Sequence, residues 1–121
     1  MARRPTAEWR ALAETDEITA RLFPPGLLHR YDAIFDTFER AVRTLTPATP
    51  DDELTVAIRD VVTALNTLND DHTHAAIATA ERDLLCGYIE QTLADSAADL
   101  DAFCTRHHLP RHELTDPWRT W

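Results

Sequence analysis

The chain has 121 residues, of which 44% are hydrophobic and 27% charged, and it contains only two glycines. This composition excludes an intrinsically disordered chain and disfavours a sheet protein, which would need many turns. With 21 acidic and 12 basic residues the formal net charge is −9, which disfavours nucleic-acid binding because an acidic surface repels phosphate backbones.

The N-terminus is basic, but no apolar run follows it, and no segment is long and apolar enough to span a bilayer. We therefore expect neither a signal peptide nor a membrane anchor, and a cytoplasmic location. The two cysteines, Cys86 and Cys104, are too few for a fold built on disulfides and are expected to stay reduced.

Two short helices are predicted before the first proline-rich break. Thr6 can cap a helix that places Trp9 and Leu12 on one side, and the residues from Thr15 onward can start a second helix that carries Phe23. The Pro-Pro-Gly run at residues 24–26 ends this segment. Residues 1–5 precede the first cap and are expected to form a disordered N-terminus.

The clearest helical periodicity lies in two longer segments. Apolar side chains recur at intervals of three and four between residues 27 and 45, and again between residues 54 and 68, which predicts two amphipathic helices. Thr49 can cap the second helix, Pro50 suits its first position, and the acids at 51–53 oppose the positive helix end. Residues 69–71 are expected to end this helix. The apolar positions are Leu27, Tyr31, Ile34, Phe38, Ala41 and Leu45 in the first, and Leu54, Ile58, Val61, Leu65 and Leu68 in the second.

A further helix is expected to begin at Thr79 and to keep one apolar phase as far as Cys104, either unbroken or divided near Asp95. Gly87 lies inside it and costs up to about 1 kcal/mol relative to alanine. We therefore interpret Gly87 as a point where a neighbouring helix packs closely.

These elements predict one all-α domain over residues 1–121, an antiparallel bundle of four to five helices. Pro110 ends the helical phase, and Thr115 or Asp116 can cap one last short turn. Residues 110–121 are expected to form a tail that docks on the bundle.

The segment NDDHTHAAIATAERD, residues 69–83, crowds acidic residues and histidines together. A zinc site needs three or four such ligands converging with tetrahedral geometry, and Pro110 disturbs the helical spacing of the later histidines that could complete one. We therefore interpret the segment as a loop between helices and expect no bound metal. The candidate ligands for a metal site are Asp71, His72, His74, His108 and His112.

Familiar catalytic motifs are missing from the sequence: it has no glycine-rich phosphate loop, no nucleophile elbow, no His-Glu-x-x-His and no Cys-x-x-Cys. Cys104 with His107 or His108 could form a thiolate pair, but Cys104 shares the apolar phase of its helix and is interpreted as a core residue. We expect neither enzymatic activity nor a cofactor.

Acidic clusters and C-terminal aromatic residues are the candidate binding features. An acidic surface complements a basic protein, because opposite charges speed encounter and sharpen specificity. Tryptophan and arginine dominate binding hot spots, so the tail is either an exposed patch or a plug that folds back onto the bundle. The candidate partner-binding residues are Asp51, Asp52, Glu53, Asp95, Asp99, Asp101, Trp118, Arg119 and Trp121.

The sequence therefore favours a non-enzymatic module that binds another, basic protein. An immunity protein that neutralises a basic toxin, a small regulator and an accessory subunit all fit, and no motif chooses among them. The alternative is a metal- or small-ligand-binding protein that uses His72 and His74 with residues 107–112. A homo-oligomer is also an option, because the stripe from Leu27 to Leu45 is broad enough to bury part of itself against a second copy. Neither nucleic acids nor membranes are expected as partners.

Overall fold

The computed structural model describes residues 2–72 and 77–121, and of His72 only the backbone. Every regular element in this part of the chain is a helix, so the predicted all-α fold is confirmed. None of these helices is long and apolar enough to cross a membrane. In chain order they are α1 (Pro5–Ala13), α2 (Glu17–Leu22), α3 (Pro25–Arg43), α4 (Asp51–His72), α5 (Thr79–Ala94), α6 (Leu100–Arg106) and a 3-10 helix, η1 (Arg111–Glu113).

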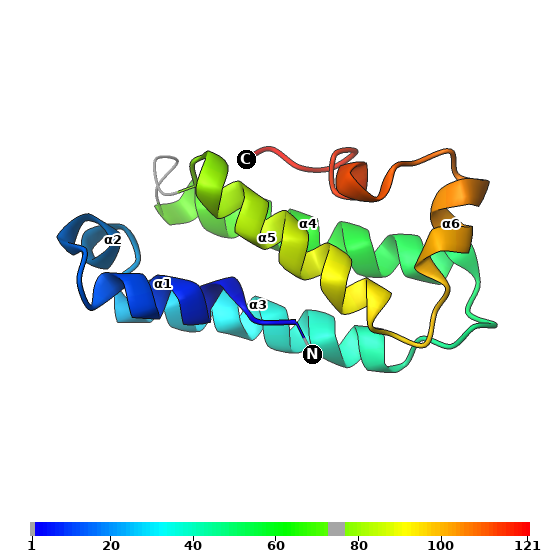
Figure 1. Ribbon diagram of the computed structural model, residues 1–121, viewed down its shortest axis with the longest axis horizontal. Coiled ribbons are helices and arrows are strands. Elements are labelled where there is room, and N and C mark those ends of the chain that lie inside the picture. Colours follow the sequence, from blue (N-terminus) through cyan, green and yellow to red (C-terminus); the bar gives the residue numbers. More distant parts are fainter. Residues whose placement is uncertain (1, 73–76) are drawn as a thin grey trace.

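Four helices form the bundle, and the shorter ones lie at its ends (Figure 1). α1 packs against α3 and α5, and α3 packs against α4 and α5. α3 runs antiparallel to α1 and to α4, and α5 runs antiparallel to α4, as Figure 1 shows. α2 lies beside α1 at one end, α6 lies at the opposite end, and the C-terminal segment returns along the bundle, where η1 contacts α5.

The core is built from the apolar stripes that the periodicity predicts. Phe35 of α3 and Ile89 of α5 are completely buried. Near α2 the core becomes aromatic: Trp9 stacks on Phe23 with ring centroids 4.2 Å apart, and Tyr31 meets Trp9 edge-on at 5.2 Å. These three rings join α1, the end of α2 and α3 into one unit.

The helix boundaries follow local capping chemistry. The predicted second helix is confirmed as α2, whose N-cap Asp16 accepts a hydrogen bond from the Ile18 amide at 3.0 Å. α3 begins at Pro25, because proline suits a first helical position that needs no amide donor. The last long helix is divided, as one alternative predicts, because Asp99 caps α6 by accepting from the Ala102 amide at 3.0 Å. The described chain thus has six α-helices, one more than the upper end of the expected four to five.

α4 extends beyond its predicted end. Residues 69–71 were expected to terminate it, but the helix continues to His72. Asn69 is buried, with 6% of its surface exposed, and its Oδ1 has no hydrogen-bond partner. The packing of Leu65 and Leu68 in the core outweighs the weak helix propensity of asparagine and aspartate.

α4 also begins differently from the prediction. The Thr49 hydroxyl accepts a hydrogen bond from the Thr46 amide at 2.7 Å, inside the preceding turn. Pro50 lies just before the helix, and its carbonyl accepts from the Glu53 and Leu54 amides. The boundary therefore falls one residue later than expected, at Asp51.

The interpretation of Gly87 as a point of close helix packing is wrong. No side-chain or distant backbone atom lies within 4 Å of the position that a Cβ atom would occupy there. Gly87 instead lines an open cavity between α5 and the C-terminal segment. A glycine inside a helix can allow a neighbouring element to approach closely, or it can leave open space beside the helix. The sequence does not distinguish these two cases.

We expect Gly87→Ala to raise the free energy of unfolding by up to about 1 kcal/mol, because alanine lowers the conformational entropy of the unfolded chain and no native contact opposes it. Urea unfolding followed by circular dichroism measures the change. Gly26→Ala, in the first turn of α3 and equally free of neighbours, is the control, with a smaller expected gain. A destabilised Gly87→Ala variant would contradict the open space at this position.

Residues 1–5 were expected to be disordered, but Arg4 and Pro5 make defined contacts with the bundle. Pro5 is buried and opens α1. Arg4 donates to Glu39 of α3 through Nε at 2.9 Å and Nη2 at 3.0 Å, and Nη2 also lies 2.6 Å from Asp36. Glu39 is only 8% exposed and accepts a further hydrogen bond of 2.5 Å from the Tyr88 hydroxyl of α5. One carboxylate thus ties the N-terminus, α3 and α5 together.

Thr6 takes part in the same network and does not cap α1. Its hydroxyl donates to Asp32 of α3 at 2.6 Å, and Arg10 donates to the second oxygen of Asp32 at 2.7 Å. Thr6 is 1% exposed. The side chain that looked like a local cap therefore makes a contact between two helices.

Candidate functional site

The outer side of α3 carries small side chains. Ala33, Thr37, Ala41 and Thr44 follow one another at helical spacing and are all exposed. The Thr37 hydroxyl donates to the Ala33 carbonyl at 3.1 Å and the Thr44 hydroxyl to the Ala41 carbonyl at 2.7 Å. These hydroxyls are already satisfied, so the strip needs no polar partner.

The facing side of α4 carries apolar and acidic residues together. Ala57 and Val61 are buried, whereas Val56 is 40% exposed. Glu53 and Asp60 are exposed and lie seven residues apart, two helical turns or about 10 Å along the axis. Both carboxylates therefore lie along the same side of α4.

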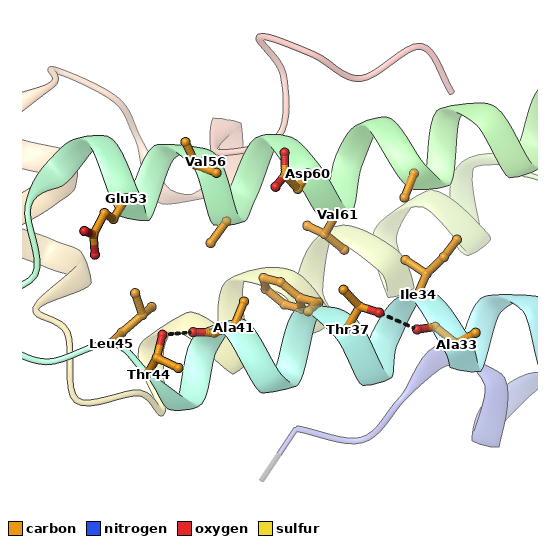
Figure 2. A pocket seen from close by; sticks show the side chains of 13 residues that line it. Ala33, Ile34, Thr37, Ala41, Thr44, Leu45, Glu53, Val56, Asp60 and Val61 are labelled. Atoms are coloured by element: carbon orange, nitrogen blue, oxygen red, sulfur yellow. Dashed lines mark hydrogen bonds between the residues drawn. The ribbon is translucent and has the colours of Figure 1, made fainter.

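A groove of about 420 Å³ runs between these two surfaces. Figure 2 shows it from outside the bundle, with Ala33, Thr37, Ala41 and Thr44 along α3 and Glu53, Val56 and Asp60 along α4. Ile34, Phe38, Leu45 and Val61 line it between the two helices. The groove is apolar over most of its lining and acidic on its α4 side.

The two predicted acidic clusters lie at the same end of the bundle. One is at the start of α4, and the other extends from the end of α5 into α6; Figure 1 shows these segments together at the α6 end. Exposed acids from both clusters are Asp52, Glu53, Asp95, Asp99 and Asp101. Only Glu53 also lines the groove between α3 and α4.

Asp51 is bound within the chain. Arg106 of α6 donates to both of its oxygens, at 2.7 and 2.9 Å, and His107 Nε2 lies 3.0 Å from Oδ2. The Arg106 guanidinium lowers the pKa of Asp51 to about 2, and His107 contributes in the same direction. Asp51 therefore holds α6 on α4, and a partner would have to break these bonds to reach it.

Two other predicted acids also have local roles. Asp99 is the N-cap of α6, and Asp101 lies 3.4 Å from Arg111 Nη1. Asp95 accepts from the Gln91 side chain at 2.8 Å, an exposed contact within one helical turn. Asp52 and Glu53 make no ion pair in the part of the chain that the structure describes.

The carboxylates that bind arginine make the stability of the fold sensitive to acid. Burial alone would raise the pKa of Glu39, but the hydrogen bonds from Arg4 and Tyr88 outweigh it and hold the pKa below its usual value. Burial likewise opposes the hydrogen bonds from Thr6 and Arg10 at Asp32, whose pKa is also lowered. These carboxylates bind protons more tightly in the unfolded chain than in the folded one. Their contribution to the free energy of unfolding is therefore complete above the pKa of the unfolded chain, and it is lost as the pH falls through the pKa of the folded chain.

We therefore expect a constant melting temperature above about pH 5 and a progressive fall from about pH 4.5 to pH 2. Thermal melts by circular dichroism across this range measure it. A melting temperature that stays constant down to pH 2 would contradict the ion pairs of Asp32, Glu39 and Asp51.

The predicted tail residues lie against the bundle. Trp118 and Trp121 are half-buried and pack on the core. The Asn66 side chain of α4 donates to the Trp118 carbonyl at 2.7 Å and accepts from the Thr120 amide at 3.2 Å. Arg119 donates to Asp116 at 2.8 Å and to the Trp121 carbonyl at 2.8 Å. The two tryptophans therefore pack against the core of the bundle and do not form an exposed patch.

The described metal-ligand candidates are not brought together. Asp71, at the end of α4, is exposed and lies 3.8 Å from Arg30. α6 lies at the opposite end of the bundle (Figure 1), and His108, two residues beyond its last residue, has φ 51°. His112 is exposed in η1. His74 and the side chain of His72 lie outside the described residues. In the described ranges, no three His, Cys, Asp or Glu side chains could together hold a metal ion.

Sequence reasoning missed the groove. It assigned Ile34 and Ala41 to the buried stripe of α3, yet Ile34 is half-buried and Ala41 is exposed. It did not single out Val56 or Asp60. The available signal was the run of small residues at 33, 37, 41 and 44 beside a periodic apolar stripe, although periodicity alone does not say which side a neighbouring helix leaves open.

The chain matches no protein-family model, no curated protein and no solved structure. A function must therefore rest on the geometry of the described residues.

Proposed function

We propose that this protein is a non-enzymatic interaction module that binds a basic protein in the groove between α3 and α4. The observation that carries the proposal is the open groove itself, with its apolar lining and with Glu53 and Asp60 along one side. An apolar lining supplies affinity by burial, and carboxylates at the edge select a partner of opposite charge.

The form of the groove fits a helical segment of the partner. It extends from Ala33 to Leu45 along α3, about 18 Å or three helical turns. Small side chains on α3 allow another helix to approach closely, and an amphipathic helix would bury its apolar side against Ile34 and Val56. Basic side chains seven residues apart on that helix would face Glu53 and Asp60.

The net charge of −9 supports the same partner. Long-range attraction would speed encounter, and the exposed acids of the α6 end, such as Asp52 and Asp95, would extend the attractive surface beyond the groove. Asp51 is not part of this proposal, because Arg106 and His107 bind it.

The proposal is tested by capture of partners from a lysate of the source organism, at low and high salt, with three forms of the full chain. Val56→Arg places a bulky cation in the groove and should lower affinity for the captured partner at least tenfold. Leu12→Arg makes the same charge change on α1, where Leu12 is 43% exposed compared with 40% for Val56, and should bind as the parent chain does.

The charge contribution is tested on the same partner once it is purified. Glu53→Gln with Asp60→Asn should slow association several-fold and flatten its salt dependence, with a smaller effect on dissociation. A partner that binds Val56→Arg as tightly as the parent chain, or whose association does not depend on salt, would overturn the proposal.

Light scattering on the purified chain separates a foreign partner from a second copy. We expect a monomer. A dimer that Val56→Arg dissociates and Leu12→Arg preserves would make the second copy the occupant of the groove, and would overturn the assignment of a basic partner.

A further inference from the structure

A second cavity, of about 320 Å³, lies between α5 and the C-terminal segment. Three of the twelve basic residues of the chain line it, Arg82 from α5 and Arg111 and Arg119 from the C-terminal segment. The Thr115 hydroxyl and the Cys86 thiol, 3.5 Å apart, also line it. In a chain with net charge −9, such a concentration of guanidinium groups in one hollow is unexpected.

The arginines of this cavity keep unused hydrogen-bond donors. The Arg82 side chain makes no ion pair or hydrogen bond within the described residues. Arg111 Nε lies 3.0 Å from Glu90 but in a geometry that makes no hydrogen bond, so this buried donor remains unsatisfied. Arg119 donates through both terminal nitrogens, and its buried Nε has no partner.

Unsatisfied buried donors on charged groups are costly, and in a folded protein they call for a physical explanation. Within the described residues Arg111 pairs with Glu90 and Asp101, and Arg119 pairs with Asp116, whereas the Arg82 guanidinium has no acidic partner. Guanidinium groups bind phosphate and carboxylate oxygens through paired hydrogen bonds. Gly87 also lines the cavity, and no atom within 4 Å would meet a Cβ there, so the space beside α5 stays open.

We propose that this cavity binds a small molecule through a phosphate or carboxylate group, with Arg82 as its principal ligand and Arg111 and Arg119 beside it. A volume of about 320 Å³ lies at the low end of the range of small-molecule pockets. This site lies on α5 and the C-terminal segment and does not rest on the proposed function of the groove between α3 and α4.

Titration calorimetry with sodium phosphate and with sodium acetate, at constant ionic strength, tests the proposal on the full chain. We expect saturable binding of at least one of these anions. Arg82→Gln should weaken that binding at least tenfold. Arg21→Gln, which removes the same charge from α2, is the matched control and should bind as the parent chain does; Arg21 is exposed. Because the Arg82 side chain makes no ion pair or hydrogen bond in the described part of the chain, its variant should remain folded.

Cys86 reports whether the anion binds in the cavity. Cys86 is half-exposed in the cavity lining and Cys104 is buried elsewhere, so a bound anion should slow alkylation of Cys86 by iodoacetamide and leave Cys104 unchanged. Binding of phosphate alone would assign a phosphate ligand, and binding of acetate alone a carboxylate ligand. No saturation by either anion, equal losses in Arg82→Gln and Arg21→Gln, or unchanged alkylation of Cys86 would each overturn the proposal.

Discussion

Replacing Trp9 with alanine should lower the free energy of unfolding by about 4 kcal/mol, the largest effect we expect from a single substitution in this chain. The indole is 1% exposed, stacks on Phe23 at 4.2 Å and meets Tyr31 edge-on at 5.2 Å. Its removal would leave a cavity that α1 cannot fill by relaxation, because the neighbouring rings are held by α2 and α3. Urea unfolding of the parent chain and the variant measures the difference.

Leu12→Ala is the control for this prediction. Leu12 lies on the same helix but is 43% exposed, so its truncation should cost less than about 0.5 kcal/mol. A loss below about 1 kcal/mol in Trp9→Ala would show that the aromatic group does not anchor α1 to the core.

The second large effect concerns the ion pair that fixes the N-terminus. Arg4→Met should destabilise the fold by about 3 kcal/mol, because it leaves the buried Glu39 carboxylate without its cationic partner. Glu39 keeps the Tyr88 hydrogen bond of 2.5 Å and a longer ion pair with Arg43 at 3.9 Å, which compensate only partly. The change in unfolding free energy at pH 7 is the measured quantity.

The neighbouring arginine provides a matched control. Arg3 is 64% exposed at its side chain and forms one ion pair of 3.5 Å with Glu8, so Arg3→Met should change stability by less than about 0.5 kcal/mol. Combining Arg4→Met with Glu39→Gln should recover part of the loss, because the uncompensated charge is gone. Additive losses in the double variant would show that Arg4 and Glu39 do not interact.

Periodicity predicted most of the fold, because helix stripes are local properties of the sequence. The prediction failed where contacts between distant residues decide the structure. Arg4 is fixed by Glu39, 35 positions away, and nothing near Arg4 in the sequence signals this contact. Asn69 and its neighbours look like helix terminators, yet the packing of Leu68 in the core carries α4 past them.

The candidate site was less predictable than the fold. The acidic clusters were visible as composition, but their meeting at one end of the bundle depends on the antiparallel arrangement of α4 and α5 and on the break before α6 (Figure 1). Asp51 looked like its neighbours Asp52 and Glu53, and the positions of Arg106 and His107 distinguish it. The groove required knowing which side of α3 and α4 remains uncovered.

The most direct test of the groove as a binding site is a methyl NMR titration of the full chain with its purified partner. The methyl groups of Ile34 and Val56 line the groove (Figure 2), while Ile18, 68% exposed on α2, lies outside its lining. Binding in the groove predicts large shifts for Ile34 and Val56 and none for Ile18. Shifts at Ile18 or Leu12, with Ile34 and Val56 unchanged, would contradict it.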